Sequence, residues 1–361
     1  MKICIVGGGN IVTLLAAELS SKGHHISIYT SKPESWSKEI TAVDVDRNIL
    51  YQGEIRKITN DIHEALIGAH YIFVTLPSIA QKEFAEKAAQ FVEPGMKFVM
   101  VPGYGGTELL MRPIIESGAI LVGMQRVHAI SRIVEYGKYV CMRGRKDSVQ
   151  IAVFNHNNQT AIVKDIQTLL DMPVLLLPTY LAITFTPSNP VLHTSRLYCL
   201  FKKYHEGVFY PSNIYFYDDW NDESSRVMLK LDSEVQKLCK CLDKLDLSSV
   251  RSLREHYESY SVESMTYKLS HIKAFKGILS PMKKTAEGWI PDFENRYFSC
   301  DFEYGLEILH NFAQICGLNT PMMDEVMDWY RAVTKKNALG LVKSFYLDKA
   351  AIYNAYSVAL K

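Results

Sequence analysis

A histidine near the start of a helical segment is the first residue whose type and position suit proton transfer. It ends the run Ser188-Asn189-Pro190-Val191-Leu192-His193. Asparagine is a favoured N-cap residue and proline suits the first helical position, so Asn189 is predicted to cap a helix that begins at Pro190, with His193 about one turn inside it. Histidine gains and loses a proton near neutral pH, which suits reduction of a carbonyl or an imine. The alternative is a structural histidine at a capped helix start, and spacing alone does not decide between them.

Two charged residues of opposite sign follow in the segment 288–306, at Arg296 and Asp301. Arginine binds a carboxylate through two parallel hydrogen bonds, and aspartate can orient a histidine and stabilise its charged form. Each also has an ordinary alternative: Arg296 could form a surface or interdomain ion pair, and Asp301 could cap the helix expected at Glu303. We expect the aromatic residues of this segment to serve packing rather than binding: Trp289, Phe293, Tyr297, Phe298 and Tyr304.

The elements that must position this chemistry begin at the N-terminus. Lys2–Val6 predicts a short buried strand, apolar spacing from Ile11 to Leu19 predicts a helix, and Ile26–Tyr29 predicts a second strand. Between the first strand and the helix lies the loop Gly7-Gly8-Gly9-Asn10. Strand, glycine loop, helix and strand in this order are typical of a dinucleotide-binding unit. The alternative is a structural glycine turn in an unrelated α/β protein.

The loop has the residues that a phosphate site needs. Gly7 allows a tight turn, Gly9 lets a pyrophosphate approach the backbone, and the helix N-terminus presents N–H groups to the phosphates. We therefore predict that Gly7, Gly8, Gly9 and Asn10 bind the cofactor. The third small position of the fingerprint is Val12, which we expect to hold the helix slightly away from the strand.

The end of the second predicted strand carries Thr30, Ser31 and Lys32, with no carboxylate until Glu34. A carboxylate at this place binds the ribose 2′-hydroxyl of NAD, whereas hydroxyls and a lysine suit the 2′-phosphate of NADP. We predict that these three residues bind the cofactor and that NADP is preferred, with NAD also accepted. The alternative is an ordinary polar loop.

Strand and helix patterns alternate to about residue 180, and only helical patterns follow. In the first part, Thr107–Glu116 predicts a helix that Pro113 bends or shortens. In the second, apolar residues at 3.6-residue spacing predict the helices Val227–Cys241, Ser249–Glu255, Glu303–Cys316, Pro321–Lys335 and Ser344–Leu360. We predict an α/β Rossmann-type N-terminal domain at 1–183 and an all-helical C-terminal domain at 184–361, with the substrate held between them.

Composition argues against several classes of protein. The 361 residues include 40 basic and 39 acidic side chains. This nearly balanced charge gives no excess of positive charge that would favour binding to nucleic acid or to an anionic membrane. No apolar run approaches the roughly 18 residues of a transmembrane helix, and the N-terminus reads as a strand rather than a leader. Seven scattered cysteines and histidines without metal-site spacing predict free thiols in a reducing cytoplasm and no metal.

Three segments together resemble the octopine/nopaline (opine) dehydrogenases over nearly the whole chain. They are the loop at 7–10, the Asn-Pro-Val-Leu-His run, and the Arg-Tyr…Asp-Phe-Glu-Tyr-Gly-Leu segment at 296–306. The resemblance implies that His193 is the catalytic histidine, Asp301 its carboxylate partner and Arg296 an arginine of the substrate pocket. Gln125–His128 corresponds to a segment near the substrate in relatives, but it differs from them and receives no role.

The resemblance also implies a reaction. The family condenses the amino group of an amino acid with a 2-keto acid such as pyruvate and reduces the resulting imine with NAD(P)H. The expected partners are these small molecules, without nucleic acid or membrane, and a homodimer is one expectation for assembly.

Two other interpretations stay open at this stage. A 2-keto or 3-hydroxy acid reductase of the same two-domain plan would need no amine, but such enzymes commonly place a lysine in the catalytic helix. Here the helix has His193, and Lys202 comes only later. A non-catalytic NADP-binding sensor is the third interpretation, and the joint presence of a histidine, an arginine and an aspartate argues against it.

Overall fold

The protein is described by a computed structural model, which covers residues 1–154 and 156–357. The chain divides into two compact units: Met1–Thr184, which the chain rejoins at Tyr356, and Phe185–Ala355. The sequence pattern predicts that the whole segment 184–361 belongs to the helical domain. The structure differs at Tyr356, whose ring lies 5.5 Å from that of Phe154 and packs in the first unit.

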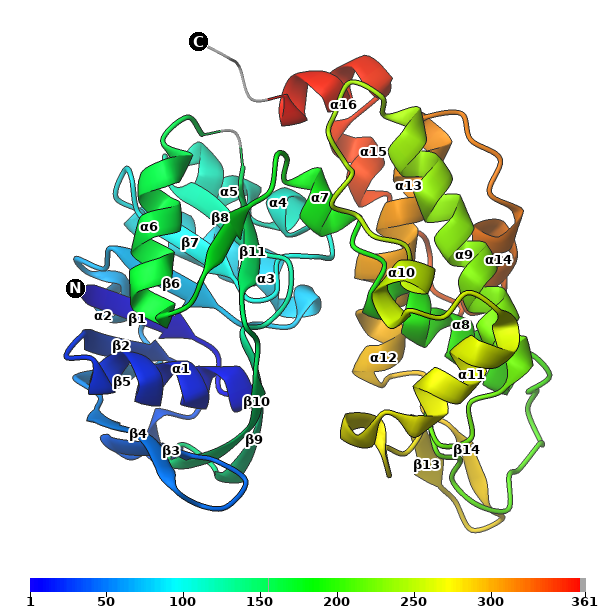
Figure 1. Cartoon of the computed structure of the whole chain (residues 1–361), viewed down its shortest axis with the longest axis horizontal. Coiled ribbons are helices and arrows are strands. Elements are labelled where there is room, and N and C mark those ends of the chain that lie inside the picture. Colours follow the sequence, from blue (N-terminus) through cyan, green and yellow to red (C-terminus); the bar gives the residue numbers. More distant parts are fainter. Residues whose placement is uncertain (155, 358–361) are drawn as a thin grey trace. The chain divides into compact units, whose positions relative to one another are not determined.

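The first unit is built on a sheet in which the described part of the chain contributes eight strands (Figure 1). Their order is β12-β11-β8-β7-β6-β1-β2-β5, and all neighbours are parallel except β11 and β8. Continuous apolar runs such as Ile3–Val6 form fully buried strands, as parallel sheets require. The strands are β1 (Lys2–Val6), β2 (His25–Tyr29), β5 (Lys57–Thr59), β6 (Tyr71–Val74), β7 (Lys97–Met100), β8 (Ile120–Met124), β11 (Val149–Val153) and β12 (Val174–Leu176).

Helix α1 (Asn10–Ser21) follows the glycine loop and is buried on every side from Val12 to Ser20. A helix buried all round must be covered on both faces. It contacts β1 and β2 and also a second sheet of order β4-β3-β10-β9, which the sequence analysis did not predict. The strands of this sheet are β3 (Glu39–Val43), β4 (Ile49–Glu54), β9 (Ala129–Glu135) and β10 (Tyr139–Arg145).

A buried ion-pair cluster joins α1 to the second sheet. Burial alone would raise the pKa of Glu18, but hydrogen bonds from His128 and Arg145 and the charge of Lys22 lower that pKa to about 2. The Nε2 atom of His128 lies 3.1 Å from Glu18, and the histidine side chain is fully buried. His128, left without a role in the sequence analysis, thus has a structural partner in α1.

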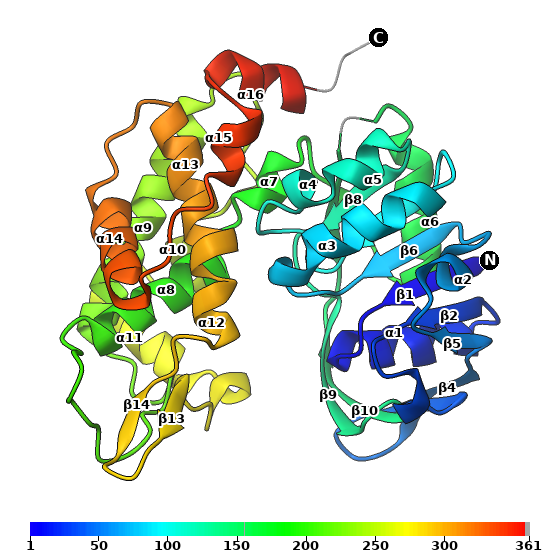
Figure 2. The same ribbon diagram turned by 180° about the vertical axis from the view of Figure 1, so that it is seen from behind.

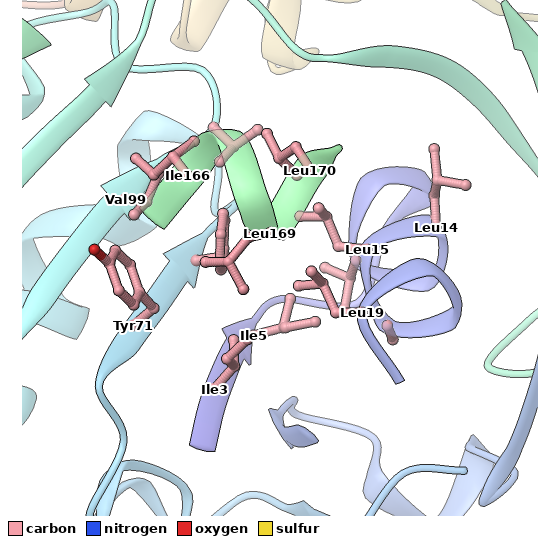
Figure 3. Packing of buried hydrophobic residues seen from close by; sticks show 14 of the residues in the cluster. Ile3, Ile5, Leu14, Leu15, Leu19, Tyr71, Val99, Ile166, Leu169 and Leu170 are labelled. Atoms are coloured by element: carbon pink, nitrogen blue, oxygen red, sulfur yellow. The ribbon is translucent and has the colours of Figure 1, made fainter. Parts of the chain in front are cut away.

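The remaining helices of the first unit cover the main sheet. In the core, Ile3 and Ile5 of β1 face Leu15 and Leu19 of α1 and Leu169 of α6 (Figure 3). The predicted helix Thr107–Glu116 is interrupted at Met111, two residues before Pro113, so the expected effect of that proline is confirmed. The helices are α2 (Ile62–Leu66), α3 (Ser78–Ala88), η2 (Ala89–Phe91), α4 (Thr107–Leu110), α5 (Arg112–Glu116), α6 (Gln159–Leu170) and α7 (Leu181–Thr184), with the short turn η1 at Pro33–Ser35.

One buried carboxyl group lies where the chain leaves the first unit and where it returns. Glu108 Oε1 accepts hydrogen bonds of 2.7 Å from the hydroxyls of Thr184 and Tyr356. Complete burial raises the pKa of Glu108 from its usual 4.5 to about 7, although both hydrogen bonds act in the opposite direction. At pH values below about 7, the folded protein therefore holds Glu108 mainly as the protonated acid.

This shift predicts a pH-dependent stability. Between the unfolded pKa and the folded pKa of about 7, the folded state binds more protons, so stability is lost as pH rises through this window. The loss should approach about 1 kcal/mol for each pH unit. Glu108→Gln keeps the shape without titrating and should flatten the dependence. Thermal midpoints of both proteins between about pH 5 and about pH 7.5 measure it, and equal slopes would contradict the assignment.

The second unit is a helical assembly with one small hairpin in its described residues (Figure 2). The elements are α8 (Asn189–Phe201), α9 (Asp222–Cys241), α10 (Leu253–Tyr257), α11 (Val262–His271), η3 (Lys273–Phe275), β13 (Met282–Lys284), β14 (Trp289–Pro291), α12 (Arg296–Ser299), η4 (Phe302–Leu306), α13 (Glu307–Ile315), α14 (Pro321–Thr334), α15 (Leu341–Phe345) and α16 (Lys349–Tyr356). In the described part of the chain, no helix is long and apolar enough to cross a membrane.

Two predicted helices differ because capping residues were overlooked. Ser252 and Glu255 form a reciprocal capping box, so α10 begins at Leu253 rather than at residue 249. The predicted helix from Ser344 is broken, because the Asp348 side chain accepts a hydrogen bond from the Ala351 backbone and starts α16. The end of that prediction, at 358–360, lies outside the described residues.

Candidate active site

Helix α8 positions His193 near its N-terminus. The helix begins at Asn189, so its N-cap is Ser188, one residue earlier than predicted. The Ser188 carbonyl accepts the first helical hydrogen bonds from the backbone N–H groups of Val191 and Leu192. His193 then lies about one turn inside the helix and is buried, with 5% of its surface exposed.

The structure brings the predicted histidine and aspartate together. His193 Nδ1 lies 2.7 Å from Asp301 Oδ2, and both side chains are buried. The Asp301 side chain makes no capping hydrogen bond to the following turn, so the helix-cap alternative does not describe it. A carboxylate only accepts hydrogen bonds, so Nδ1 carries the hydrogen that it donates to Asp301. In the neutral ring, Nε2 is then the atom that can accept a proton.

Close packing between α8 and the π-helical turn η4 sets this distance. A Cβ atom on Gly305 would lie 2.9 Å from the Cβ of Pro190, closer than real Cβ atoms approach. Glycine at 305 therefore lets η4 rest directly on the first turn of α8. Asp301, immediately before η4, thereby comes within reach of His193.

Arg296 and Tyr297 extend the site beyond the pair. The Tyr297 ring stacks on the imidazole of His193 at 4.5 Å between centroids, and Arg296 Cζ lies 6.0 Å from the Tyr297 centroid. The Arg296 side chain is exposed and forms no ion pair or hydrogen bond with the described residues. An unpaired guanidinium near the histidine can bind a substrate carboxylate.

Tyr217 is a member of the site that the sequence analysis missed. Its hydroxyl lies 3.0 Å from His193 Nε2, and its side chain is buried. The residue lies in an irregular segment before α9, 24 positions after the histidine. Nothing in the local sequence marks it, because the contact depends on how this segment packs on α8.

The glycine loop has the geometry that a dinucleotide requires. Gly7 has φ +129°, and a Cβ there would lie 2.7 Å from Thr75 Oγ1 and 3.1 Å from Val12 Cγ2. A Cβ atom added to Gly9 would have no neighbouring heavy atom of the described residues within 4 Å, so the backbone at Gly9 is open to a ligand. No side chain caps α1, and its first turn holds no acidic residue, so its N-terminus suits phosphate.

The other predicted cofactor residues divide into two groups. Asn10 Oδ1 accepts a 2.7 Å hydrogen bond from the Ile133 backbone, which ties the loop to β9. Thr30 is buried, and its Oγ1 accepts a bond from the Lys32 backbone. Ser31 and Lys32 are exposed, and their side chains have no hydrogen bond or ion pair to the described residues. Of the three residues after β2, these two are open to a 2′-phosphate.

No group of three or more His, Cys, Asp or Glu residues in the described ranges is arranged to hold a metal ion. A cavity of about 500 Å³ in the first unit is lined in part by Arg112, Glu116 and Phe154, and none of the predicted site residues lines it.

Comparison with known proteins identifies both parts of the chain. Residues 176–334 match the α-helical domain of the NAD/NADP octopine/nopaline dehydrogenases, and residues 2–117 match the N-terminal domain of NAD-dependent glycerol-3-phosphate dehydrogenase. Opine dehydrogenase of Haliotis discus hannai and octopine dehydrogenase of Pecten maximus are each 24% identical to this chain. The matches cover 91% of this chain and 88% and 89% of those proteins.

A solved structure of octopine dehydrogenase with NADH and L-arginine has the same fold. It superposes with a TM-score of 0.82 at 20% identity, over 97% of this chain and 92% of that one. With its NAD(P)-binding domain and helical domain, the chain is a two-domain NAD(P)-dependent oxidoreductase. In its helical domain, and in relatives aligned over about nine-tenths of its length, it resembles the octopine/nopaline dehydrogenases.

Proposed function

We propose that the protein joins a 2-keto acid to the amino group of an amino acid and reduces the imine with NAD(P)H. The observation that carries this proposal is the buried His193–Asp301 pair, 2.7 Å apart, inside the segment that matches the opine dehydrogenase helical domain. The unpaired Arg296 close by supplies a binding group for a carboxylate, which both substrates possess.

Each residue has a defined part in this reaction. Arg296 binds the keto-acid carboxylate and so orients the carbonyl carbon. The amine nitrogen bonds to that carbon, and the carbonyl oxygen leaves as water, which requires a proton. His193 supplies or holds this proton at Nε2, while Asp301 keeps Nδ1 protonated and stabilises the imidazolium. The bound nicotinamide cofactor supplies the hydride that reduces the imine carbon.

The glycine loop and the residues after β2 would hold this cofactor. The open backbone at Gly9 and the uncapped N-terminus of α1 suit the pyrophosphate. Gly8 precedes Gly9, and a Cβ atom on Gly8 would lie 2.6 Å from the Tyr136 hydroxyl oxygen. Ser31 and Lys32 suit a 2′-phosphate, so we propose NADPH as the preferred cofactor, with NADH also accepted.

Lys32→Ala should weaken NADPH binding and leave NADH binding unchanged, because only the phosphate meets the ammonium group. Loss of one charged hydrogen bond predicts roughly a 10- to 100-fold effect. Fluorescence titration with both cofactors measures it. Lys38→Ala, which removes another exposed lysine of the same loop, serves as the control. Tighter binding of NADH than NADPH by the unmodified protein would refute the preference.

The keto-acid reductase interpretation finds little support in α8. Lys202, the lysine that could replace the histidine, lies at the C-terminal end of the helix. Its ammonium is 2.6 Å from Glu223 and serves an ion pair. The two interpretations differ in whether cofactor oxidation requires an amine.

The test is a panel of amino acids with pyruvate and other 2-keto acids, followed by NADPH absorbance. Oxidation that requires both substrates supports the proposal, and a secondary amine should appear by mass spectrometry. Oxidation with keto acid alone would indicate the reductase, and binding without oxidation would indicate a sensor. The seven free cysteines support a reducing cytoplasm as the location of the protein. The expected homodimer is a separate proposal, and light scattering tests it.

A further inference from the structure

Both nitrogens of the His193 ring are hydrogen-bonded. Asp301 and Tyr217 are the two partners, and the proposed reaction gives no role to Tyr217. Nδ1 is bonded to Asp301, and Nε2 lies 3.0 Å from the Tyr217 hydroxyl. Because Nδ1 donates to the carboxylate, Nε2 of the neutral ring accepts, and the phenol donates. The atom that must exchange the proton is therefore covered by a tyrosine hydroxyl.

The Tyr217 ring is held in place by aromatic neighbours. It stacks on Phe275 at 4.2 Å between centroids and lies 6.1 Å from Trp220 at an interplanar angle of 11°. Phe216 contacts both the tyrosine and the His193 ring. Such packing leaves the ring few orientations, so the direction of the hydroxyl is set before any substrate binds.

A buried arginine holds the main chain around Tyr217. Arg196 lies one turn after His193 on α8 and is 1% exposed. Its guanidinium donates to the carbonyl oxygens of Phe216 and Asp219 at 2.9 and 2.7 Å, on both sides of the tyrosine. Burial lowers the pKa of Arg196 to about 10, so the group still carries its charge at neutral pH.

The arginine also reaches Ser224 Oγ at 3.1 Å, near the start of α9. One guanidinium therefore connects α8, the segment that carries Tyr217, and α9. A planar fork of five donors can hold several acceptors at once, which a lysine ammonium cannot reproduce. His193 and Arg196 both lie on α8. Because Arg196 binds the segment that carries Tyr217, the position of Tyr217 relative to His193 is fixed.

We propose that Tyr217 is a positioning residue for His193, that its hydroxyl serves both protonation states of Nε2, and that Arg196 holds it there. This rests on the proposed function, in which His193 exchanges a proton. To the neutral ring the hydroxyl donates a hydrogen bond. When Nε2 gains a proton, the hydroxyl hydrogen rotates away and its oxygen accepts from the imidazolium, so no bond at Nε2 is lost.

The proposal gives a direction for the pH dependence. In the described residues, the titratable groups in direct contact with the His193 ring are Asp301, Tyr217 and Tyr297, with Arg296 against Tyr297. A hydrogen bond from the charged ring is stronger than one to the neutral ring. Removing the hydroxyl should therefore disfavour the imidazolium and move the pH–rate midpoint to lower pH.

Tyr217→Phe tests this, because it keeps the stacked ring and removes only the hydroxyl. We expect turnover to fall roughly 5- to 30-fold and the pH–rate midpoint to move down by about half a unit to one unit. Arg196→Lys should give a smaller shift in the same direction. Tyr198→Phe is the matched control, since it removes the hydroxyl of a buried tyrosine on α8, where it is bonded to Glu325, and should leave the midpoint unchanged.

A second measurement is independent of turnover. Histidine-labelled protein, with His193→Ala used to assign the signal, reports the tautomer and titration of the His193 ring by NMR. Tyr217→Phe should move this titration to lower pH. An unchanged titration and turnover in Tyr217→Phe, while His193→Ala is inactive, would overturn the positioning role alone. Full turnover in His193→Ala would instead refute the proposed function on which it rests.

Discussion

Replacing His193 with alanine should lower turnover by roughly 10²- to 10⁴-fold, the usual contribution of a general acid–base residue. The ring is the buried group whose Nε2 can exchange a proton, and alanine leaves Asp301 without its partner. Cofactor affinity should be unchanged, because His193 lies in the second unit and the glycine loop in the first. Single-turnover rates and cofactor titrations on the same preparation measure both quantities.

Asp301→Asn should cause a smaller loss and move the pH–rate profile to lower pH. The carboxylate favours the imidazolium, and an amide does not. Because the two residues act as a unit, the double variant should lose far less than the product of the two single losses. Multiplicative losses would show that the residues act separately and that the pair has no shared catalytic role.

The structure provides a matched control for these variants. His310 is also buried and bonded to a carboxylate, with Nε2 2.6 Å from Asp324, but it lies in α13 and contacts none of the proposed site residues in the described chain. His310→Ala should lower the thermal midpoint and leave turnover per folded molecule nearly normal. If His193→Ala behaved in the same way, His193 would be a structural residue of α8.

Local patterns predicted the parts of the fold that local physics determines. The glycine loop, the alternation of strands and helices, and the interruption near Pro113 follow from residue types a few positions apart. His193 and Asp301 were recognised because each lies in a segment that resembles one family, and the structure places them 2.7 Å apart. Their catalytic roles remain predictions.

Contacts between distant segments account for what was missed. Asn10, which is predicted to bind the cofactor, also accepts a hydrogen bond at its side-chain oxygen from the backbone of Ile133, 123 positions away, and no local pattern marks this contact. Strand β4 was not predicted because its residues are mostly exposed or half-buried and show no buried run. Tyr217 was missed for a different reason. Its role depends on how its segment packs against α8, and the spacing of residues in the sequence does not reveal this packing.

Arg296→Lys should damage use of the keto acid far more than binding of the cofactor. A guanidinium binds a carboxylate through two parallel hydrogen bonds, whereas an ammonium is a point charge and loses at least one of them. Losing a charged hydrogen bond costs on the order of 1.5–3 kcal/mol, so kcat/KM for the keto acid should fall roughly 10- to 150-fold. Little stability should be lost, because the side chain is exposed and unpaired in the described chain.

Arg226→Lys is the matched control, since Arg226 is an exposed arginine of α9 whose side chain has no hydrogen bond or ion pair to the described residues. It should leave every kinetic constant unchanged. Comparing pyruvate with the corresponding amide, which lacks the carboxylate, isolates the contact. The unmodified protein should discriminate strongly between the two, and Arg296→Lys should discriminate much less. If Arg296→Lys keeps normal kcat/KM for pyruvate and full discrimination against the amide, another group must bind the substrate carboxylate.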